Sequence, residues 1–545
     1  MRPISFLLFL ILVSNTIHPQ QLSVKSFGCY GGSETDYITN SIMTRDSSVY
    51  IVLRSFSQDR DVGYAPAESK AWIVKCNLAG DTIWTRSYYI SSENYLYTIR
   101  ELPGGNLILA GLAPFDYKIG EGLWIVVIDP DGNLLKSTLY DNNGHTAAWD
   151  IRICDDDSFI LAGETLDESV PGFHKNGANE DIIVQKMDSD FNITWSKAFG
   201  GSGADIGRFI FPTNNGGFVL FGNVVSDNGD VEDNHGTGMN TNDIWAAKIN
   251  SSGEIEHQNC IGGSWHERLS SVILTLDKGY LLIGNTTSDD GDVIGFCESG
   301  FVPGLEDLFI AKLDSSLNTQ WAKAYGGFDK DYGHSGYQDK DGSFFIIGSN
   351  GADGCWVDDN HGYSDWWFCR IGKNGEMVFK QSMGTDKTDY GNYMYRSGSN
   401  KLLSMGVVPS GIFIDGGLTD FDLFLLSLEF ISEIPDTGDS TIITNPDSTV
   451  ITTPDSTIIT NPDSTLTTNP DIVNIDMRIY PNPARELITI DHPAFLEIRL
   501  YDMNGREMIY SKQKYVDISM LSRGMYIARI YSLDHTFRLV KLLIE

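Results

Sequence analysis

The middle of this chain reads Trp195-Ser-Lys-Ala-Phe-Gly-Gly-Ser-Gly-Ala-Asp205, then Asn215-Gly-Gly-Phe-Val-Leu-Phe-Gly222, then Asp243-Ile-Trp-Ala-Ala-Lys248 and Ser252-Gly-Glu-Ile255. Short runs rich in aromatic and branched residues alternate here with Gly and Asp turns, a pattern typical of successive β-strands. The next copy gives Ile261–Glu267, Lys278–Gly284 and Asp307–Lys312. Helical periodicity is nearly absent, so the sequence predicts an all-β fold built from a repeated unit.

Seven copies of this unit lie between residues 21 and 430. Their third strands share an aromatic or aliphatic anchor, at Trp72, Trp124, Ile183, Trp245, Phe309, Trp367 and Phe424. The spacing of roughly 50 to 65 residues, with four strand signals per copy, is typical of a propeller blade. We therefore predict a seven-bladed β-propeller over 21–430.

The two ends of the repeat array complement one another. The last copy has no fourth strand after its third, at Asp422–Phe430, and an unassigned strand, Leu22–Gly32, precedes the first copy. The N-terminal strand is therefore expected to complete the seventh blade, which would close the ring and remove exposed sheet edges. The alternative, two smaller β-domains, leaves both features unexplained.

Residues that recur in most copies are expected to hold the blades together, because a single ligand site does not need one copy per blade. They include acids at the third-strand start and bases further along that strand: Asp181, Asp243, Asp307, Asp365 and Asp422, and Lys75, Lys186, Lys248, Lys312 and Arg370. The Gly-Gly pairs at 31–32, 200–201, 262–263 and 326–327 are expected to be tight turns with positive φ.

A binding surface is expected where the repeat is broken, in the loops between second and third strands and the neighbouring turns between blades. The residues expected to form this ligand-binding face are Trp265, His266, Trp356, His361 and His235. The tryptophans could stack on sugars or could pack between blades. Cys297 and Cys355 lie in loops of neighbouring blades and are candidates for a disulfide.

Two of these loops, Asp227-Asn-Gly-Asp230 and Asp289-Asp-Gly-Asp292, resemble part of a calcium-binding loop. Calcium is therefore a candidate ligand, with Asp227, Asp230, Asp289 and Asp292 as the metal-binding residues. Neither loop has the Glu that closes an EF-hand, and ordinary Asx turns are the alternative interpretation.

The composition excludes some classes of partner. Lysine and arginine number 39 against 73 acids, a net charge of −34, which argues against binding to nucleic acid and to anionic membranes. No Gly-x-Ser-x-Gly or His-Glu-x-x-His motif is present, and no carboxylate pair for glycoside hydrolysis can be chosen from the acids.

The C-terminal residues carry a separate signature. Tyr480-Pro-Asn-Pro483 opens the segment, Asn504-Gly505 follows a strand, Leu521-Ser-Arg-Gly-Met-Tyr526 comes next, and the chain ends on Lys541-Leu-Leu-Ile-Glu545. This order resembles the type A C-terminal sorting domain of the type IX secretion system. The resemblance implies a small immunoglobulin-like β-sandwich over 474–545, recognition by the secretion machinery, cleavage by its sorting peptidase and attachment to a surface lipopolysaccharide.

The N-terminus and the linker agree with export. Met1-Arg2 and an apolar run from Ile4 to Val13 predict a signal peptide over 1–20, and no other run is long enough to span a membrane. Residues 431–473 form a Pro- and Thr-rich repeat typical of an extended stalk. Its Asp-Ser-Thr triplets resemble the O-glycosylation sites of bacteria that use this route, which implies glycans on Ser440, Ser448, Ser456 and Ser464.

Together these features predict a secreted or surface-attached propeller that binds an extracellular glycan or protein. Two alternatives stay open. The first is a hydrolase or lyase acting on extracellular polysaccharide, and the second is a structural adhesin.

Overall fold

The chain divides into two compact units after Ile431. The computed structural model describes residues 21–64, 67–115, 120–140, 144–174, 179–236, 241–297, 305–358, 360–384, 387–398, 401–409 and 421–431 of the first unit. In the second unit it describes 478–480, 485, 487–491, 495–501, 507–532 and 537–544. Every element in these ranges is a strand, and none of the described residues forms a helix long and apolar enough to cross a membrane.

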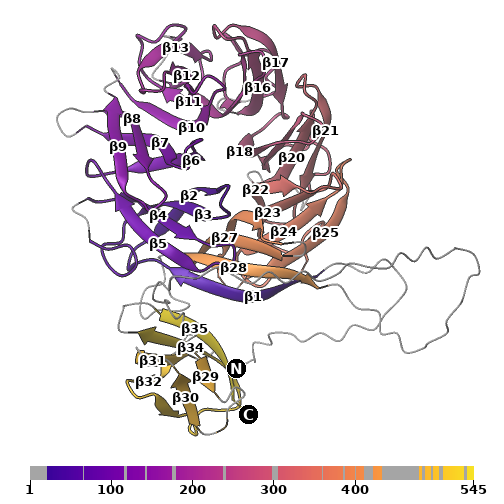
Figure 1. Cartoon of the computed structure of the whole chain (residues 1–545). Helices are drawn as coiled ribbons and strands as arrows, with labels where there is room; N and C mark the ends of the chain where they lie inside the picture. Colours follow the sequence, from indigo (N-terminus) through magenta and orange to yellow (C-terminus); the bar gives the residue numbers. More distant parts are fainter. Residues whose placement is uncertain are drawn as a thin grey trace, which may run out of the picture. The chain divides into compact units, whose positions relative to one another are not determined.

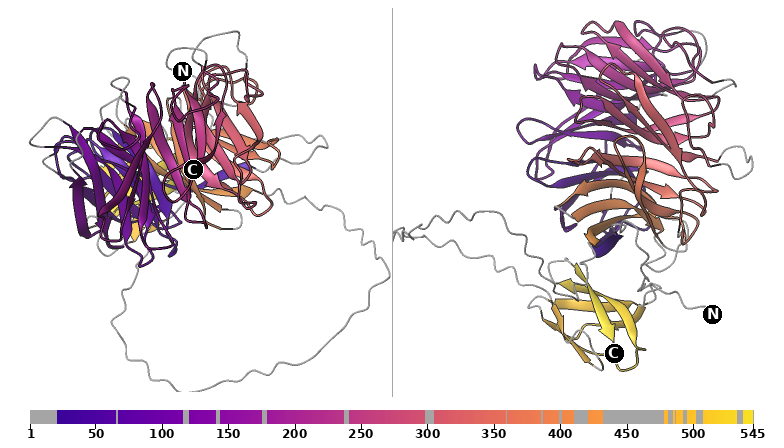
Figure 2. Two further views of the ribbon diagram at one scale, coloured as in Figure 1. Left: turned by 90° about the horizontal axis from the view of Figure 1, so that it is seen from above. Right: turned by 90° about the vertical axis from the view of Figure 1, so that its right-hand side faces the viewer.

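The described part of the first unit contains seven four-stranded antiparallel sheets arranged around a central axis (Figure 1), which is a seven-bladed β-propeller. The innermost strands of blades 1 to 7 are β2 (Asp36–Met43), β6 (Tyr95–Glu101), β10 (Thr146–Ile153), β14 (Asp205–Pro212), β18 (Glu267–Leu274), β22 (Tyr332–Gln338) and β26 (Tyr390–Arg396). Figure 2 shows from two further sides how the sheets of successive blades stack around the ring.

Three further strands complete each blade outward. The second strands are β3 (Val49–Ser55), β7 (Leu107–Pro114), β11 (Phe159–Thr165), β15 (Phe218–Val224), β19 (Tyr280–Thr286), β23 (Phe344–Asn350) and β27 (Lys401–Pro409). The third strands are β4 (Lys70–Cys76), β8 (Glu121–Ile128), β12 (Asp181–Met187), β16 (Asp243–Ile249), β20 (Asp307–Leu313), β24 (Asp365–Ile371) and β28 (Phe421–Ile431). The outer strands are β5 (Thr82–Tyr88), β9 (Leu134–Tyr140), β13 (Ile193–Phe199), β17 (Ile255–Ile261), β21 (Thr319–Tyr325), β25 (Met377–Met383) and, in blade 7, β1 (Gln21–Tyr30).

The middle strands read as continuous apolar runs because the sheets of both neighbouring blades cover them. Every residue of β4 and β20 is buried, whereas most of β9, at the rim, is exposed. The third-strand anchors Trp72, Ile183, Trp245 and Phe309 are fully buried. At roughly 25 cal/mol per Å² of buried apolar surface, these layers between blades supply most of the driving force for folding.

The N-terminal strand lies where its sequence predicts. β1 runs antiparallel to β28, with Leu22 opposite Phe430 and Tyr30 opposite Leu423. Leu22 is 3% exposed, and its backbone N–H donates to the side-chain oxygen of Gln381 in blade 6 (2.8 Å). One blade is thus built from both ends of the propeller sequence.

The recurrent acids and bases do not pair with one another, because they sit near opposite ends of the same strand. Lys186 instead pairs with Asp156 (3.1 Å), and Lys312 pairs with Asp277 (2.9 Å). These partners lie in the turns that join the first and second strands of the same blade. Lys186 and Lys312 are therefore paired with acids of these turns, whereas the third-strand acids Asp181, Asp243, Asp307 and Asp365 are buried.

The expectation of positive φ throughout the Gly-Gly pairs is wrong. Gly200 has a φ of 149°, but Gly262 is not among the residues with positive φ. A Cβ atom at Gly262 would lie 2.3 Å from Glu267 Oε2 and 2.7 Å from Asp243 Oδ1. Glycine is needed there because two buried carboxyl groups approach the backbone closely.

The described part of the second unit has two antiparallel sheets. One contains β29 (Arg478–Tyr480), β30 (Leu487–Asp491) and β33 (Tyr515–Asp517); the other contains β31 (Phe495–Tyr501), β32 (Glu507–Ser511), β34 (Gly524–Ser532) and β35 (Phe537–Ile544). Ile488 and Val516 of the first sheet share one core with Ile498, Ala528 and Leu542 of the second. The immunoglobulin-like topology stays a prediction. The Pro-Asn-Pro and Asn-Gly turns, the linker and residues 1–20 lie outside the described residues.

Candidate functional site

A β-bulge interrupts the innermost strand of every blade at the same place. The residue left unpaired at each bulge is, in blade order, Thr39, Tyr97, Trp149, Arg208, Ser270, His334 and Asn392. A bulge turns one side chain away from the regular alternation of the strand, and such bulges are common beside functional sites. The propeller thus presents one re-aimed side chain per blade on its innermost strands.

Glycines of the second strands make room for these bulges. In six blades the residue paired with the strand just before the bulge is Gly111, Gly163, Gly222, Gly284, Gly348 or Gly406. A Cβ atom at Gly163 would lie 1.8 Å from the carbonyl oxygen of Ala147, so no larger residue fits. Each bulge residue precedes its glycine by fourteen positions, a constant spacing visible in the sequence alone.

The bulge positions differ between blades that are otherwise similar along their strands. Anchors, junction acids and glycines recur, whereas these seven positions hold seven different side chains. A position kept for blade packing should repeat its chemistry, as the anchors do. The bulges therefore present unlike side chains on the innermost strands, which makes the axis a candidate place for ligand recognition.

A cavity of about 220 Å³ lies among the innermost strands. Its lining comprises Thr39, Asn40, Ser41, Tyr97, Arg100, Trp149, Arg152, Arg208, Phe209, Ser270, Ser271, Val272, Ser335, Gly336, Tyr393, Met394 and Tyr395. Pockets that enclose a whole drug-sized ligand measure ~300–1,000 Å³, so this cavity suits one unit or one group of a larger ligand.

The wall from blades 2 to 4 is aromatic and cationic. The rings of Tyr97 and Trp149 stack with centroids 4.1 Å apart and an interplanar angle of 18°. The guanidinium carbon of Arg208 lies 4.1 Å from the Trp149 ring, and it must cover the other face because Tyr97 fills the first. This stack fixes the plane of the Arg208 guanidinium.

Asp150 organises the other two arginines of the cavity. Its side chain is fully buried and accepts hydrogen bonds from Arg100 and from Arg152 Nε (2.9 Å). It also accepts one from the backbone N–H of Ile210 (3.1 Å), so both oxygens are occupied. Burial, and then the like charge of Arg152, lower the pKa of Arg100 to about 10, which leaves it charged at neutral pH.

A second polar chain supports the tryptophan. The indole N–H of Trp149 donates to Glu164 Oε2 (3.1 Å), and His145 bridges Glu164 (3.1 Å) and Glu121 (2.9 Å) through its two ring nitrogens. Both contacts favour the doubly protonated ring, so the hydrogen bond with Glu164 raises the pKa of His145. Glu164 is therefore already engaged by two donors beside the cavity.

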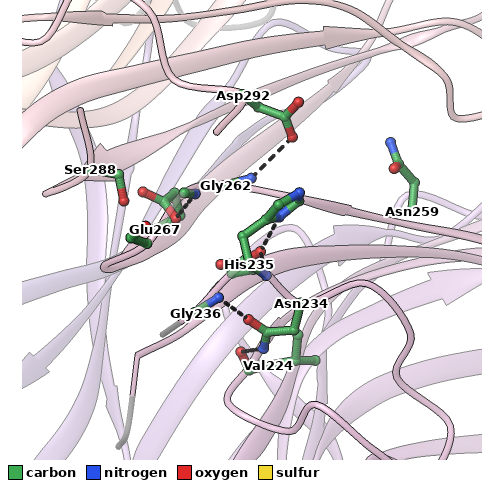
Figure 3. A network of polar contacts seen from close by, with 12 residues as sticks. Val224, Asn234, His235, Gly236, Asn259, Gly262, Glu267, Ser288 and Asp292 are labelled. Carbon is green, nitrogen blue, oxygen red and sulfur yellow. Dashed lines mark hydrogen bonds and ion pairs between the residues drawn. The ribbon is translucent and has the colours of Figure 1, made fainter. Parts of the chain in front are cut away.

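The histidines expected on the ligand face lie in blade junctions instead. His235 Nδ1 is 2.7 Å from Asp243 Oδ2, and its backbone N–H donates to the same oxygen (2.9 Å; Figure 3). His361 contacts Asp365 in the same way, with Nδ1 at 2.6 Å. Because blade 3 repeats this contact with His174 and Asp181, the arrangement is a recurring loop cap.

The acidic loops bind backbone rather than one another. Asp292 accepts from the N–H of Gly262 (3.3 Å; Figure 3), and Asp230 accepts from Gly200 (3.4 Å). Asp227 contacts only the adjacent Asn228 side chain (3.0 Å). Across the described ranges, no group of three or more His, Cys, Asp or Glu side chains is placed to hold a metal ion. The four predicted metal-binding residues do not contact a common point: Asp227, Asp230, Asp289 and Asp292.

The predicted ligand-face tryptophans are separate. Trp265 is 45% exposed on the turn into blade 5, and Trp356 is 37% exposed in blade 6, edge-on to Tyr325 at 5.8 Å. His266 contacts Asn242 through Nδ1 (2.8 Å). No hydrogen bond or ring contact joins any two of the five predicted residues, so they form no single described site. Sequence reasoning missed the cavity because the fourteen-residue spacing to the second-strand glycine was not recognised as a bulge signal.

Cys297 and Cys355 are joined by a disulfide, with Cα atoms 6.0 Å apart. Cys297 takes the place of the junction histidine in blade 5, and its backbone N–H donates to Asp307 (2.8 Å). Cys76, Cys154, Cys260 and Cys369 are free thiols. The disulfide thus ties the loops of blades 5 and 6 where the histidine cap is missing.

Carboxyl groups with raised pKa values lie away from the cavity. Burial raises the pKa of Asp36, Glu267 and Asp307 to about 7 and that of Asp331 to about 8. All four are buried at blade junctions, and none lines the cavity. The described cavity therefore does not offer the pair of perturbed acids that a glycosidase needs.

Comparison with known proteins settles the nature of the C-terminal unit. Residues 478–545 match the secretion system C-terminal sorting domain family. The chain is thus a β-propeller with a type IX sorting tail, which implies handling by the secretion machinery and export to the cell surface or beyond. None of the curated proteins compared with the chain matches it.

Several solved structures resemble the chain at low identity. The WD40 domain of Neurospora crassa Pan2 is 8% identical with a TM-score of 0.42, covering 76% of this chain and 97% of that one. Kuenenia stuttgartiensis hydrazine synthase is 12% identical with a TM-score of 0.36, covering 58% and 78%. PorZ, a bacterial surface component of the type IX secretion system of Porphyromonas gingivalis, is 12% identical with a TM-score of 0.26, covering 92% and 69%. At these values the likenesses carry no inference about binding or catalysis.

Proposed function

We propose that the exported propeller is a binding protein that takes one unit of an extracellular glycan into its axial cavity. The observation that carries this proposal is the cavity lined by the bulge residues of blades 1 to 5, whose side chains all differ: Thr39, Tyr97, Trp149, Arg208 and Ser270. A recognition role needs such a set of unlike side chains converging on one space.

The chemistry of the lining favours a sugar over a protein segment. Hydroxyl groups of Thr39, Ser270 and Ser271, with the amide of Asn40, surround a space too small for a folded element. Short polar side chains of this kind match the hydroxyl groups of a polyol, and the rings of Tyr97 and Trp149 supply a flat wall. A protein ligand would need a larger surface than this cavity gives.

Binding without catalysis follows from the position of the acids. Asp150, the fully buried carboxylate beside the described cavity, accepts hydrogen bonds from Arg100, Arg152 and a backbone N–H, so both of its oxygens already have partners. The hydrolase or lyase interpretation would require perturbed carboxyl groups at the cavity, and those lie at the junctions. We further propose that export removes residues 1–20 and the sorting tail, and that the stalk carries glycans on Ser440, Ser448, Ser456 and Ser464.

The test is a glycan-array screen of the full chain, with release of reducing ends measured for every ligand that binds. We expect binding without release. Ser271→Trp fills the cavity and should abolish binding, while Ser251→Trp, on the exposed hairpin between β16 and β17, should not. Equal binding by both variants would place the ligand elsewhere, and release of new ends would establish the enzyme interpretation.

A further inference from the structure

The cavity concentrates positive charge in an acidic protein. The chain carries a net charge of −34, yet Arg100, Arg152 and Arg208 line the cavity from three successive innermost strands. Asp150 is the one carboxylate in the described lining region that pairs with them. Since field lines are focused in a narrow space with low-dielectric walls, this excess of cations should attract an anion.

Arg208 is the arginine without a partner. It is half-buried and stacked on Trp149, and it forms no hydrogen bond or ion pair with any residue that the structure describes. The acid whose charge acts on Arg208 is Glu164, but the Glu164 carboxylate already contacts the indole N–H of Trp149 and the ring of His145. A guanidinium withdrawn from water without a partner is costly, so the site is arranged for a negative group that arrives with a ligand.

The guanidinium is also oriented in advance. Trp149 covers one of its faces, so the five N–H groups remain available along its edge. Arg152 is held by Asp150 through Nε, and its guanidinium packs on Phe211 at 4.4 Å. Its terminal nitrogens form no ion pair with any acid among the described residues. Arg208 and Arg152 therefore present two guanidinium groups from the innermost strands of adjacent blades. Their N–H groups can bind the oxygens of one carboxylate or sulfate group.

The opposite wall leaves space for that group. Blades 5 and 6 contribute Ser270, Ser271, Ser335 and Gly336, whose side chains are small and uncharged. They supply hydroxyl donors but no competing acid. The positively charged side chains of the cavity therefore lie on blades 2 to 4, and the small uncharged residues that leave space for a ligand lie on blades 5 and 6.

We infer that the unit bound in the cavity carries an oxyanion, a carboxylate or a sulfate ester, which is held by Arg208 and Arg152. The ligand class is then an acidic extracellular polysaccharide, and this inference rests on the proposed function. Neutral polysaccharides of the same backbone should bind more weakly because they leave Arg208 without a partner.

The experiment uses the full chain and matched pairs of oligosaccharides that differ only by a uronic acid carboxylate or a sulfate ester. Arg208→Gln should weaken binding of the acidic member roughly tenfold to a hundredfold, the loss expected for hydrogen bonds to a charged group. Arg208→Lys, which keeps the charge but not the planar fork, should fall between. Arg86→Gln removes one exposed arginine from β5 and should leave binding unchanged.

Competition against the wild-type protein keeps the inference testable should the Arg208 variants not fold. Glucuronate or inorganic sulfate should displace a bound acidic oligosaccharide, and glucose at equal ionic strength should not. Preference for the carboxylated or the sulfated member identifies the source of the oxyanion. Equal binding of neutral and acidic members would overturn the inference and leave the proposed function standing, whereas failure of every glycan to bind would overturn the proposed function itself.

Discussion

At the scale of single residues, glycine and buried acids decide where each side chain of the propeller can go. The second-strand glycines allow the carbonyl before each bulge to approach, and the bulge then aims one side chain out of the regular pattern. The junction glycines similarly admit the carboxyl groups of neighbouring blades. Both effects depend on atoms that are distant in sequence.

Replacing Gly163 with alanine tests the bulge. The new methyl group would lie 1.8 Å from the Ala147 carbonyl oxygen, so the innermost strand must shift. We expect a loss of about 1–3 kcal/mol in the free energy of unfolding, typical of overpacking, measured by urea denaturation. Gly104→Ala is the matched control, because nothing lies within 4 Å of its added Cβ. Equal effects of both changes would show that the bulge does not need glycine.

Glu267 provides a pH test. Burial raises its pKa from 4.5 to about 7, so the folded state binds this proton more tightly than the unfolded state does. Stability should therefore increase as pH falls from 8 towards 5, the reverse of what a salt-bridged acid produces. Asp156 does not interfere with this test. Hydrogen bonds from Ser158 and Lys186 lower its pKa to about 2, so the stability that it contributes is lost only below pH 5.

The variant Glu267→Gln replaces the group by a neutral one of similar shape. It should raise the urea midpoint at pH 8, where the wild-type carboxyl is ionised, and change it little at pH 5. The amide can still accept from Gly263 and donate to the Thr286 hydroxyl. A lower midpoint for the variant at pH 8 would contradict the assignment.

At the scale of elements, each blade is a sheet that cannot bury both faces alone. Stacking against neighbours buries nearly every described residue of the second and third strands, which is why they read as apolar runs without alternation. Loops between second and third strands are tied to the turn before their own blade, as the Asp292–Gly262 contact shows. In blade 5 the Cys297–Cys355 disulfide additionally joins this loop to the corresponding loop of blade 6.

The disulfide prediction belongs to these loops. Changing Cys297 and Cys355 together to serine should lower the free energy of unfolding by roughly 2–4 kcal/mol, because the bridge closes a segment of 58 residues. Denaturation midpoints with and without reductant measure the effect, and the double variant should not respond to reductant. Cys154→Ser, at a free thiol, is the control. A wild-type midpoint that reductant leaves unchanged would contradict the prediction.

At the scale of the whole molecule, the chain combines a ring of stacked blades with a separate sorting tail. The tail implies handling by the type IX secretion machinery, while the innermost strands of the propeller line the candidate cavity. The two units have separate hydrophobic cores.

Export gives the prediction at this scale. Deleting residues 478–545 should abolish surface display and leave the propeller inside the cell envelope, as cell fractionation and surface labelling would show. Intact-mass analysis of the displayed wild-type protein should find the tail absent. As a control, Ser251→Trp should be displayed normally. Normal display of the truncated chain, or tail peptides on the surface form, would contradict the export proposal.

Most of the fold could be predicted from the sequence because its signals are local and repeated. Strand length, apolar runs, turns, the seven anchors and the missing fourth strand of blade 7 are all visible along the chain. The sorting tail is likewise marked by a fixed order of turns and strands. Repetition multiplies a weak local signal seven times, which is why the blade count needed no coordinates.

Only the tertiary structure revealed the candidate cavity on the propeller axis. The sequence ranked Trp265, His235 and His361 as ligand contacts because they interrupt the repeat, yet closure of the ring places the histidines against buried acids. It gave no reason to combine Arg208 with Trp149, which are 59 residues apart and meet through bulges on adjacent blades. Local sequence determines which segments form strands. Which side chains lie together on the axis depends on how the seven innermost strands close into a ring.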